Sequence, residues 1–347
     1  MQRSSEIAGS RALVTGGAGF IGSHLCEALL AAGCEVIALD NLSTGTRANL
    51  AHLDPGEGFE LVVGDTTDEE LVVSLIERSD VVFHLAAAVG IDLIVDGPLR
   101  SLHANVSGTQ CVLRVAARSR VPTLVASTSE VYGKAESFPQ REEDDVVLGP
   151  SSVRRWSYAA GKLMDEHLAL AYHRECGLPA VVFRLFNVVG PRQSGRFGEV
   201  IPRFADAALA GATLQVNGDG QQSRCFLHVD DAVEAIMLLA CAPSAVGRVF
   251  NIGSSEEVSI LELAERVLAA AGEHLVPAGL GGIRLRDYAE AFPDGGYEDI
   301  RRSVPDSARL RAHTGWQPQR SLDDVIEAVL GERLGDALAA AERLALA

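Results

Sequence analysis

The sequence predicts an α/β fold, in which a doubly wound parallel sheet is joined to a smaller, interleaved C-terminal lobe. Two patterns predict it: apolar, strand-like runs alternate with segments of helical spacing through the first half, and shorter elements follow after about residue 190. A chain of 347 residues is also long enough to bury a large core. We therefore expect one large α/β unit with a second lobe beside it.

Six strand-like runs define the expected main sheet, at 11–16, 35–40, 59–65, 80–86, 122–127 and 180–185. Segments with apolar residues at helical spacing lie between them, at 20–32, 67–78, 98–119 and 155–176. Because helices separate the strands, the connections are crossovers and the strands are expected to run parallel.

The second half of the chain has shorter elements. We expect helices near 198–211, 230–241 and 259–271, and strands at 213–217 and 247–252. The stretch 273–304 has little periodicity and indicates a lid or a binding loop. The chain is accordingly divided into a main domain over 1–190, an interleaved lobe over 191–330 and a helical tail over 331–347.

The charge of the chain limits its partners. It has 30 Lys and Arg against 47 Asp and Glu, a net charge of −17, so its field repels phosphate backbones and anionic membranes. We expect no nucleic-acid or membrane partner and no metal ion. An anionic substrate would have to be held by a few isolated arginines and by helix N-termini.

The cysteine pattern and the N-terminus indicate a cytoplasmic protein. The six cysteines form no CxxC pair, and most lie in apolar contexts typical of free thiols. The first ten residues lack the apolar segment of an export signal, and no apolar run approaches the length of a membrane span.

A glycine-rich turn follows the first strand. It contains Gly17-x-Gly19-x-x-Gly22, and Gly16 adds an overlapping spacing. Such glycines let the backbone approach a pyrophosphate at a helix N-terminus. The second strand ends in Asp40, 18 residues beyond Gly22, where a carboxylate can bind a ribose diol and would repel a 2′-phosphate. This predicts a Rossmann-type domain that binds NAD rather than NADP.

The next two strands end in residues that would line the same crevice. Asp65 can reach the adenine, and the small residues 86–88 allow close approach of the dinucleotide. We interpret His84, at the end of a buried strand, as a hydrogen-bonded core residue.

Tyr158 and Lys162 are four residues apart, so they share one helix face. An ammonium beside a phenol lowers the pKa of the phenol, which can then take a proton from a substrate hydroxyl while a hydride leaves for NAD. At the end of the fifth strand, Thr128 can hydrogen-bond to the reacting oxygen and Glu130 adds a carboxylate. For Ser127 and Ser129 a helix-capping role is the alternative.

These motifs together resemble the extended short-chain dehydrogenases/reductases, the family of NAD-dependent nucleotide-sugar epimerases, dehydratases and decarboxylases. The resemblance covers about 11–330 and rests on TGGAGFIG, Asp40, STSEVYG, SYAAGK and RLFNVVGPR. STSEVYG, RRWSYAAGK and GGYEDIRRSVPD are similar to UDP-glucuronate decarboxylases, including those of the aminoarabinose pathway.

The resemblance implies roles for individual residues. Catalysis falls to Thr128, Tyr158 and Lys162, with Glu130 as an additional acid. Contacts to NAD fall to Gly16, Gly19, Phe20, Ile21, Gly22, Asp40, Asn41, Asp65, Thr66, Leu85, Ala86, Ala87, Asn105, Tyr158 and Lys162. Contacts to the sugar nucleotide, over the second lobe, fall to Ser129, Glu130, Asn187, Arg192, Val200, Arg203, Gln215, Arg224, Asp299 and Arg302.

Two segments depart from the decarboxylase pattern. The stretch 86–98 lacks the Pro-rich, Tyr-containing segment that many of these enzymes have after the fourth strand. Ser303 stands where the aminoarabinose-pathway group has an Arg thought to meet the substrate carboxylate. Arg301 or Arg302 could substitute for it, or the acid is held differently.

The resemblance implies a redox-neutral UDP-glucuronate decarboxylase that retains NAD and makes UDP-xylose or UDP-4-keto-xylose. A 4,6-dehydratase of nucleotide hexoses and a UDP-sugar 4-epimerase are the alternatives, and a non-catalytic nucleotide sensor is a third. The family also implies a homodimer, in which the helices at about 98–119 and 155–176 form a four-helix bundle with a second copy.

Overall fold

A seven-stranded parallel sheet forms the centre of the larger lobe. The structure is a computed structural model that describes residues 7–345 except 54–55, 57, 89–98, 100–101, 196–198, 275–280 and 293–297. The sheet has the order β11-β6-β5-β4-β1-β2-β3. Its strands are β1 (Arg11–Thr15), β2 (Glu35–Asp40), β3 (Phe59–Val63), β4 (Val81–His84), β5 (Thr123–Thr128), β6 (Ala180–Leu185) and β11 (Val249–Ile252). The predicted doubly wound parallel fold is confirmed.

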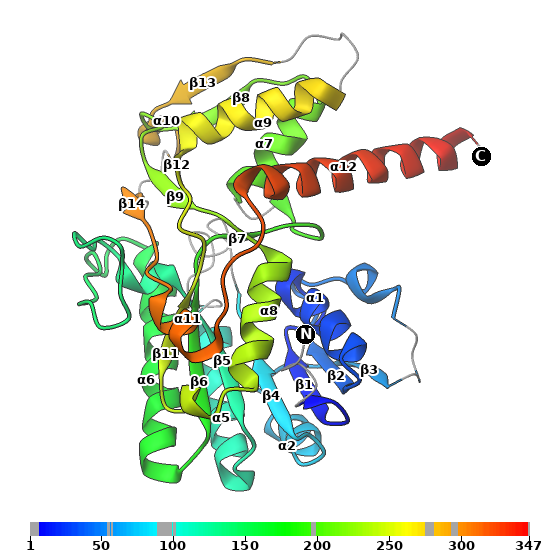
Figure 1. Cartoon of the computed structure of the whole chain (residues 1–347), viewed down its shortest axis with the longest axis vertical. Coiled ribbons are helices and arrows are strands. Elements are labelled where there is room, and N and C mark those ends of the chain that lie inside the picture. Colours follow the sequence, from blue (N-terminus) through cyan, green and yellow to red (C-terminus); the bar gives the residue numbers. More distant parts are fainter. Residues whose placement is uncertain are drawn as a thin grey trace.

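Helices cover both faces of this sheet (Figure 1). The helices α2 (Glu69–Ile76), α5 (Gly108–Ser119) and α6 (Trp156–Cys176) pack on one face, against Leu13 and Val82. The helices α1 (Phe20–Ala31), α8 (Val229–Ala240) and α11 (Ala308–Thr314) pack on the other, against Ala12 and Val14. Because successive strand residues point to opposite faces, both sets of strand residues are buried and the runs are apolar throughout.

The smaller lobe has its own apolar core. It contains the helices α7 (Val200–Leu209), α9 (Ile260–His274) and α12 (Leu322–Ala345), and the strands β8 (Leu214–Asn217) and β13 (Ile283–Arg286), which pair in parallel. Short strands lie between the lobes: β7 (Val188–Val189) pairs with β10 (Leu227–His228), and β9 (Ser223–Cys225) pairs with β12 (Glu257–Ser259) and β14 (Arg302–Ser303).

The chain crosses between the lobes more than once. Helix α8 packs on the main sheet, and β11 pairs with β6 at its edge, although the sequence placed both in the second lobe. An apolar strand and its crossover helix have the same sequence pattern in either lobe. Spacing alone therefore could not tell to which lobe α8 and β11 belong. The stretch 273–304, expected to be a loop, contains β13, β14 and the short helix α10 (Tyr288–Ala291).

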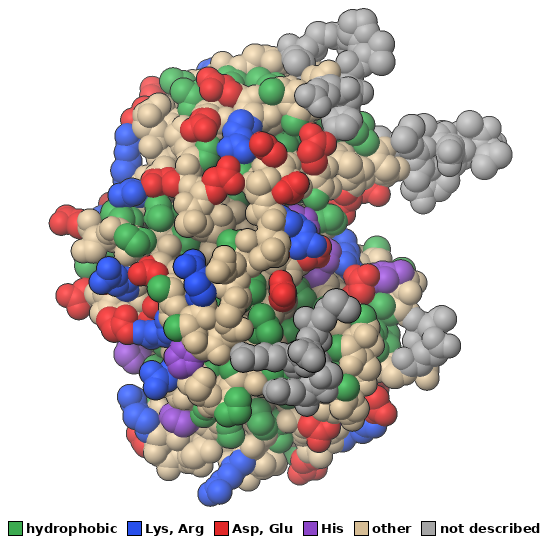
Figure 2. All heavy atoms as spheres, in the orientation of Figure 1, with side chains coloured by type: hydrophobic (Ala, Val, Ile, Leu, Met, Phe, Trp, Pro, Cys, Tyr) green, Lys and Arg blue, Asp and Glu red, His purple; other side chains and the backbone are tan. Residues whose placement is uncertain are grey.

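The surface carries mixed charge. On the face shown in Figure 2, Lys and Arg side chains are interspersed with the more numerous Asp and Glu. Among the described residues, no helix is long and apolar enough to cross a membrane. All six cysteines are free, and four of them are buried, as their apolar contexts predicted.

Candidate active site

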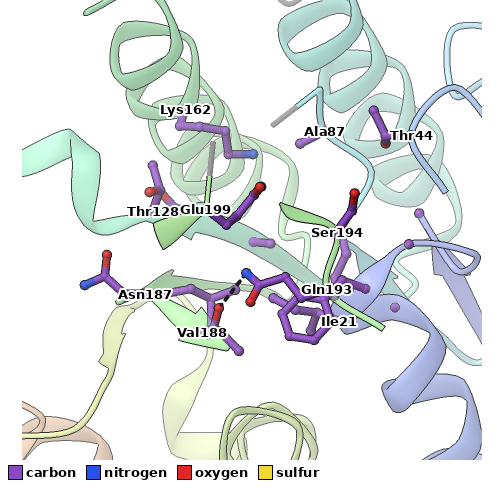
Figure 3. A pocket seen from close by; sticks show the side chains of 18 of the residues that line it. Ile21, Thr44, Ala87, Thr128, Lys162, Asn187, Val188, Gln193, Ser194 and Glu199 are labelled. Carbon is purple, nitrogen blue, oxygen red and sulfur yellow. Dashed lines mark hydrogen bonds between the residues drawn. The ribbon is translucent and has the colours of Figure 1, made fainter. Parts of the chain in front are cut away.

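A cavity of about 460 Å³ opens at the carboxyl ends of the central strands, beside the start of α1. This is where ligands bind in open α/β sheets. The cavity brings together all four predicted catalytic residues and the glycine-rich turn. In Figure 3, Thr128 and Lys162 lie on one side of it and Ile21 on the other.

Two glycines shape the cofactor side of the cavity. Gly16 has φ +72°, and a Cβ there would lie 2.9 Å from the backbone nitrogen of Ala86. A Cβ on Gly22 would lie 2.0 Å from the carbonyl oxygen of Gly16. Both positions therefore require glycine, because any side chain would push the turn away from β4 or from α1. The resulting cradle is the right kind of surface for a pyrophosphate.

The N-terminus of α1 faces this cradle. Its N-cap residue is Gly19, whose backbone is extended and which supplies no side-chain cap. Gly19, Phe20, Ile21 and Gly22 line the cavity. The first N–H groups of a helix have no partner within the helix, so they can donate hydrogen bonds to bound phosphates.

Asp40 ends β2 at the edge of the cavity, as predicted. Its carboxylate accepts hydrogen bonds from the backbone nitrogens of Ala18, at 3.0 Å, and Leu42, at 2.8 Å. Burial raises the pKa of Asp40, and these backbone donors oppose the rise. The carboxylate is thus held in place beside the glycine turn, where a ribose diol would meet it.

A small second cavity adjoins the first beyond Asp40. Asn41, Asp65, Thr66, Ala86 and Ala87 line it, which are five of the predicted cofactor contacts. Asp65 accepts a 2.8 Å hydrogen bond from the side-chain nitrogen of Asn41. Burial opposes the shift, but hydrogen bonds from the Thr67 backbone, from Asn41 and from the Thr67 hydroxyl lower the pKa of Asp65. Leu85 lines the main cavity.

Asn105 lies behind this surface and lines neither cavity. Its side-chain oxygen accepts a 2.7 Å hydrogen bond from the nitrogen of Ala88, and its amide group donates a longer one to the Ala88 carbonyl. Asn105 therefore holds the backbone that follows β4 in this structure. It lies in a π-helical turn (His103–Ser107) that precedes α5, where the sequence predicted one continuous helix.

Tyr158 and Thr128 meet at the opposite wall of the cavity. Thr128 ends β5, Tyr158 lies on α6, and both side chains line the cavity. Burial raises the pKa of Tyr158, the carboxylates of Glu130 and Asp165 raise it further, and the nearby Thr128 hydroxyl opposes them. The expected lowering of this pKa by Lys162 is therefore not found.

The pKa of Tyr158 is not lowered by Lys162 because the Lys162 ammonium pairs with a carboxylate. The Nζ atom lies 2.8 Å from Oδ2 of Asp165, and both side chains are buried. Burial raises the pKa of Asp165, whereas Lys162 and the nearby Thr109 hydroxyl lower it. Asp165 is not among the residues that the sequence predicted for the site, although it lies one helical turn beyond Lys162.

A chain of buried polar groups continues from Thr109. His84 lies 2.9 Å from the Thr109 hydroxyl and 2.8 Å from that of Thr15, whose oxygen accepts a hydrogen bond from the nitrogen of Ala86. Burial, with a smaller contribution from Lys162, lowers the pKa of His84 to about 3. His84 is thus the hydrogen-bonded core residue that the sequence predicted.

The predicted sugar-nucleotide contacts divide into two groups. Ser129, Glu130, Asn187 and Arg192 line the main cavity. The side-chain nitrogen of Asn187 donates a 2.9 Å hydrogen bond to the carbonyl of Cys225. The Arg192 guanidinium donates to the carbonyl of Asn49 and to Glu27, so it lies at the end of the cavity nearest α1.

The other predicted contacts, which do not line the cavity, are Val200, Arg203, Gln215, Arg224, Asp299 and Arg302. Arg224 and Asp299 pair with each other at 2.8 Å. Arg302 pairs with Glu257, and Arg301 pairs with Asp219. Neither arginine is therefore placed to substitute, at the cavity, for the family Arg that Ser303 replaces. The other departure, residues 86–98, lies largely outside the described residues.

Several residues that line the cavity were not predicted from the sequence, among them Thr44, Thr46, Asn49, Arg155, Gln193 and Glu199. Most lie in loops that the motifs do not reach. Arg155 could have been found, because it precedes Tyr158 by three residues and so lies one helical turn away from it.

Comparison with known proteins agrees with the NAD-binding geometry of the site. The family model described as "NAD dependent epimerase/dehydratase family" matches residues 12–253. A UDP-N-acetyl-alpha-D-glucosaminuronate decarboxylase of Bacillus cytotoxicus is 38% identical, covering 90% of this chain and 94% of its own. UDP-glucuronic acid decarboxylase 1 of Xenopus tropicalis is 35% identical, covering 92% of this chain and 71% of its own.

Two further relatives carry epimerase names. A UDP-glucose 4-epimerase of Mycolicibacterium smegmatis is 37% identical, covering 91% of this chain and 96% of its own. The crystal structure of UDP-glucuronic acid 4-epimerase from Bacillus cereus, in complex with UDP-glucuronic acid and NAD, superposes with a TM-score of 0.82. It is 27% identical, covering 93% of this chain and 98% of that one. This chain belongs to the NAD-dependent epimerase/dehydratase family.

Proposed function

We propose that this protein is a UDP-glucuronate decarboxylase that uses bound NAD in a redox-neutral cycle and forms UDP-xylose or UDP-4-keto-xylose. The observation that carries the proposal is one cavity in which Tyr158, Thr128 and Lys162 face a glycine cradle, with an arginine and a glutamate beside them. The decarboxylase names of two relatives support the same choice.

The cofactor half of the cavity fits NAD. Gly16 and Gly22 leave room for a pyrophosphate, the α1 N-terminus offers N–H donors, and Asp40 offers a carboxylate to a ribose. When bound, NAD supplies the acceptor for a hydride from C4 of the sugar and returns that hydride if the cycle closes.

Tyr158 and Thr128 carry out the proton chemistry at C4. Tyr158 takes the proton of the 4-hydroxyl, which becomes a ketone. The C5–carboxylate bond then breaks, CO2 leaves, and the electron pair moves into the C4 carbonyl. Protonated Tyr158 and Thr128 donate hydrogen bonds to the oxyanion that develops there, and C5 is reprotonated.

Product analysis separates this function from its alternatives. Purified protein, with NAD added, is incubated with UDP-glucuronate, and the product is examined by mass spectrometry and NMR. We expect a loss of about 44 mass units, or about 46 if the 4-ketone is released. An unchanged mass with inverted C4 would make the protein an epimerase, and no reaction would favour a dehydratase that acts on a neutral hexose.

We further propose a homodimer in which α5 and α6 pack against the same helices of a second copy. The two helices lie side by side at the edge of the larger lobe (Figure 1), and Met164 on α6 is half exposed. Light scattering tests this: the wild type should have the mass of a dimer, and Met164→Glu should have the mass of a monomer. A monomeric wild type would overturn the proposal. The six free thiols support a cytoplasmic location.

A further inference from the structure

We propose that Asp165 is a positioning residue for the reaction: it holds the Lys162 ammonium at the cavity wall, neutralises its charge, and so sets the pH range in which Tyr158 acts as the base. The inference deepens the proposed function and rests on it, because Asp165 acts on the sugar only through Lys162 and Tyr158. Asp165 itself does not line the cavity, so we assign it no contact with a ligand.

The ion pair between Lys162 and Asp165 is short and buried. The Nζ atom lies 2.8 Å from Oδ2 of Asp165, and the two side chains are 3% and 0% exposed. Lys162 lines the cavity wall (Figure 3), whereas Asp165 does not, so the carboxylate lies behind the ammonium. An ammonium has three N–H donors and this bond uses one of them, so a ligand can bind without breaking the pair.

The helix α6 places the three side chains in a row. Lys162 follows Tyr158 by four residues, and Asp165 follows Lys162 by three, so each is the neighbour of the next on one buried face. The ammonium therefore has the phenol one turn before it and the carboxylate one turn after it. Its charge acts on both.

The carboxylate cancels much of the charge that the phenol would otherwise meet. A lysine without a counter-ion favours the phenolate of a neighbouring tyrosine and lowers the pKa of that tyrosine. With a carboxylate 2.8 Å from the ammonium, the two opposite charges largely offset each other at Tyr158, in a wall where little water screens either. In agreement, burial raises the pKa of Tyr158, and Glu130 and Asp165 raise it further.

The other charged or titratable groups around the site are paired or neutral. Glu130, just after β5, pairs with Arg155 at the start of α6. Glu166 is held by Arg184 of β6, through Nε at 2.9 Å and Nη2 at 2.7 Å. On β4, His84 has a pKa of about 3 and is neutral. The lysine ammonium thus takes its counter-charge from the carboxylate one turn along its own helix.

Helix α5, which the structure describes along its whole length, brings no charge to the pair. Its arginines, Arg114 and Arg118, both pair with Glu69 on α2. Burial raises the pKa of the Cys111 thiol, which is therefore neutral. His103, in the π-helical turn before α5, is exposed and lies 3.2 Å from the hydroxyl of Ser107.

Absorbance titration of Tyr158 tests the inference without turnover. Phenolate absorbance is followed from pH 7 to pH 11 in the wild type, Asp165→Asn and Glu166→Gln, all freed of NAD because its positive nicotinamide ring would also act on the phenol. Each protein is compared with its own Tyr158→Phe form, so the difference belongs to Tyr158. In Asp165→Asn the ionisation should move down by about one pH unit or more. Glu166→Gln removes a buried carboxylate from the next position of the helix and should titrate as the wild type does.

The pH dependence of turnover gives a second readout, with NAD and UDP-glucuronate present. The pH at which kcat reaches half its maximum should fall by roughly one unit in Asp165→Asn. A merely structural loss would lower kcat at every pH and leave that midpoint in place. If Asp165→Asn has the midpoints of the wild type, or if Glu166→Gln shifts them equally, the role of Asp165 is overturned.

The wild type alone decides the question if Asp165→Asn does not fold. Compared with Tyr158→Phe, it should show no ionisation of Tyr158 below about pH 10. An ionisation below that pH would mean that Lys162 acts on the phenol in spite of Asp165. Release of CO2 by the wild type is scored separately: if the titration is as expected and no CO2 is released, the decarboxylase proposal fails and the effect of Asp165 on Tyr158 stands.

Discussion

The two sides of the cavity are built differently. The cofactor side consists of strand ends, the glycine turn and the start of α1, and a buried chain of polar groups from Thr15 through His84 to Thr109 lies behind it. On the side of the smaller lobe, the predicted contacts Arg224, Asp299 and Arg302 are joined in ion pairs that do not line the cavity.

The two sides therefore have different roles: the cofactor side holds the reacting groups, and the side of the smaller lobe selects the substrate. On the cofactor side, tight packing fixes the reacting groups before any ligand arrives, which is the requirement for electrostatic catalysis. On the other side, an exposed ion pair such as that of Arg302 with Glu257 can change partners at small cost, as substrate binding needs. Substitutions on the cofactor side should therefore affect turnover or folding strongly, and those on the other side should affect affinity alone.

The largest effect is expected at Tyr158. Tyr158→Phe removes the proton acceptor and the oxyanion donor, so turnover of UDP-glucuronate should fall roughly 10²- to 10⁴-fold. NAD binding should persist, because the ring and the glycine cradle remain. Both are measured on the same preparation, by product formation and by titration with NAD. Unchanged turnover would remove Tyr158 from the mechanism.

Gly22→Ala should disrupt the cofactor side itself. The new Cβ would lie 2.0 Å from the Gly16 carbonyl oxygen, so the turn must move. We expect the free energy of unfolding to fall by about 1–3 kcal/mol. Binding of NAD should weaken as well, because the displaced turn forms the cradle. Urea unfolding with and without NAD measures both. Gly331→Ala is the control, because a Cβ there meets nothing within 4 Å. Equal behaviour of the two variants would show that the cradle is not tight.

The same contrast explains what the sequence could predict. The parallel strands and the motif positions on the cofactor side follow from local spacing, because the ends of parallel strands meet at one edge of the sheet. The order of the strands in the sheet was not predicted. Asp165 and Arg155 lie one turn from predicted residues, and their partners became visible only in three dimensions. The partners of Arg224 and Arg302 are 75 and 45 residues away in the chain, and no local pattern specifies them.

The buried polar chain predicts a dependence on pH. His84 has a pKa of about 3 in the folded protein against 6.5 as its ordinary value. Below pH 6.5 the unfolded chain binds a proton that the folded protein excludes, so stability falls as the pH falls towards 3. The loss between pH 7.5 and pH 5 is about 2 kcal/mol for this residue.

Urea unfolding at pH 7.5 and pH 5 checks this for the wild type and two variants. In His84→Gln the loss of stability between the two pH values should be about 2 kcal/mol smaller than in the wild type, even though the variant is less stable overall. His52→Gln, at an exposed position, should behave as the wild type does. A His84→Gln variant that loses as much stability as the wild type would mean that His84 is not buried in its neutral form.

The smallest effects are expected on the side of the smaller lobe, where two arginines allow a matched comparison. Arg224, which is largely buried in its pair with Asp299, is the predicted phosphate ligand, so Arg224→Gln should weaken binding of UDP-sugars about tenfold. Arg302→Gln, which removes a more exposed pair with Glu257, should change neither the affinity nor the stability by more than about 0.5 kcal/mol. Titration with UDP-glucose isolates the contribution of the nucleotide, because glucose has no carboxylate. If both variants bind UDP-glucose as the wild type does, the nucleotide is held by the cavity wall at Asn187 and Arg192, and the smaller lobe acts only as a cover.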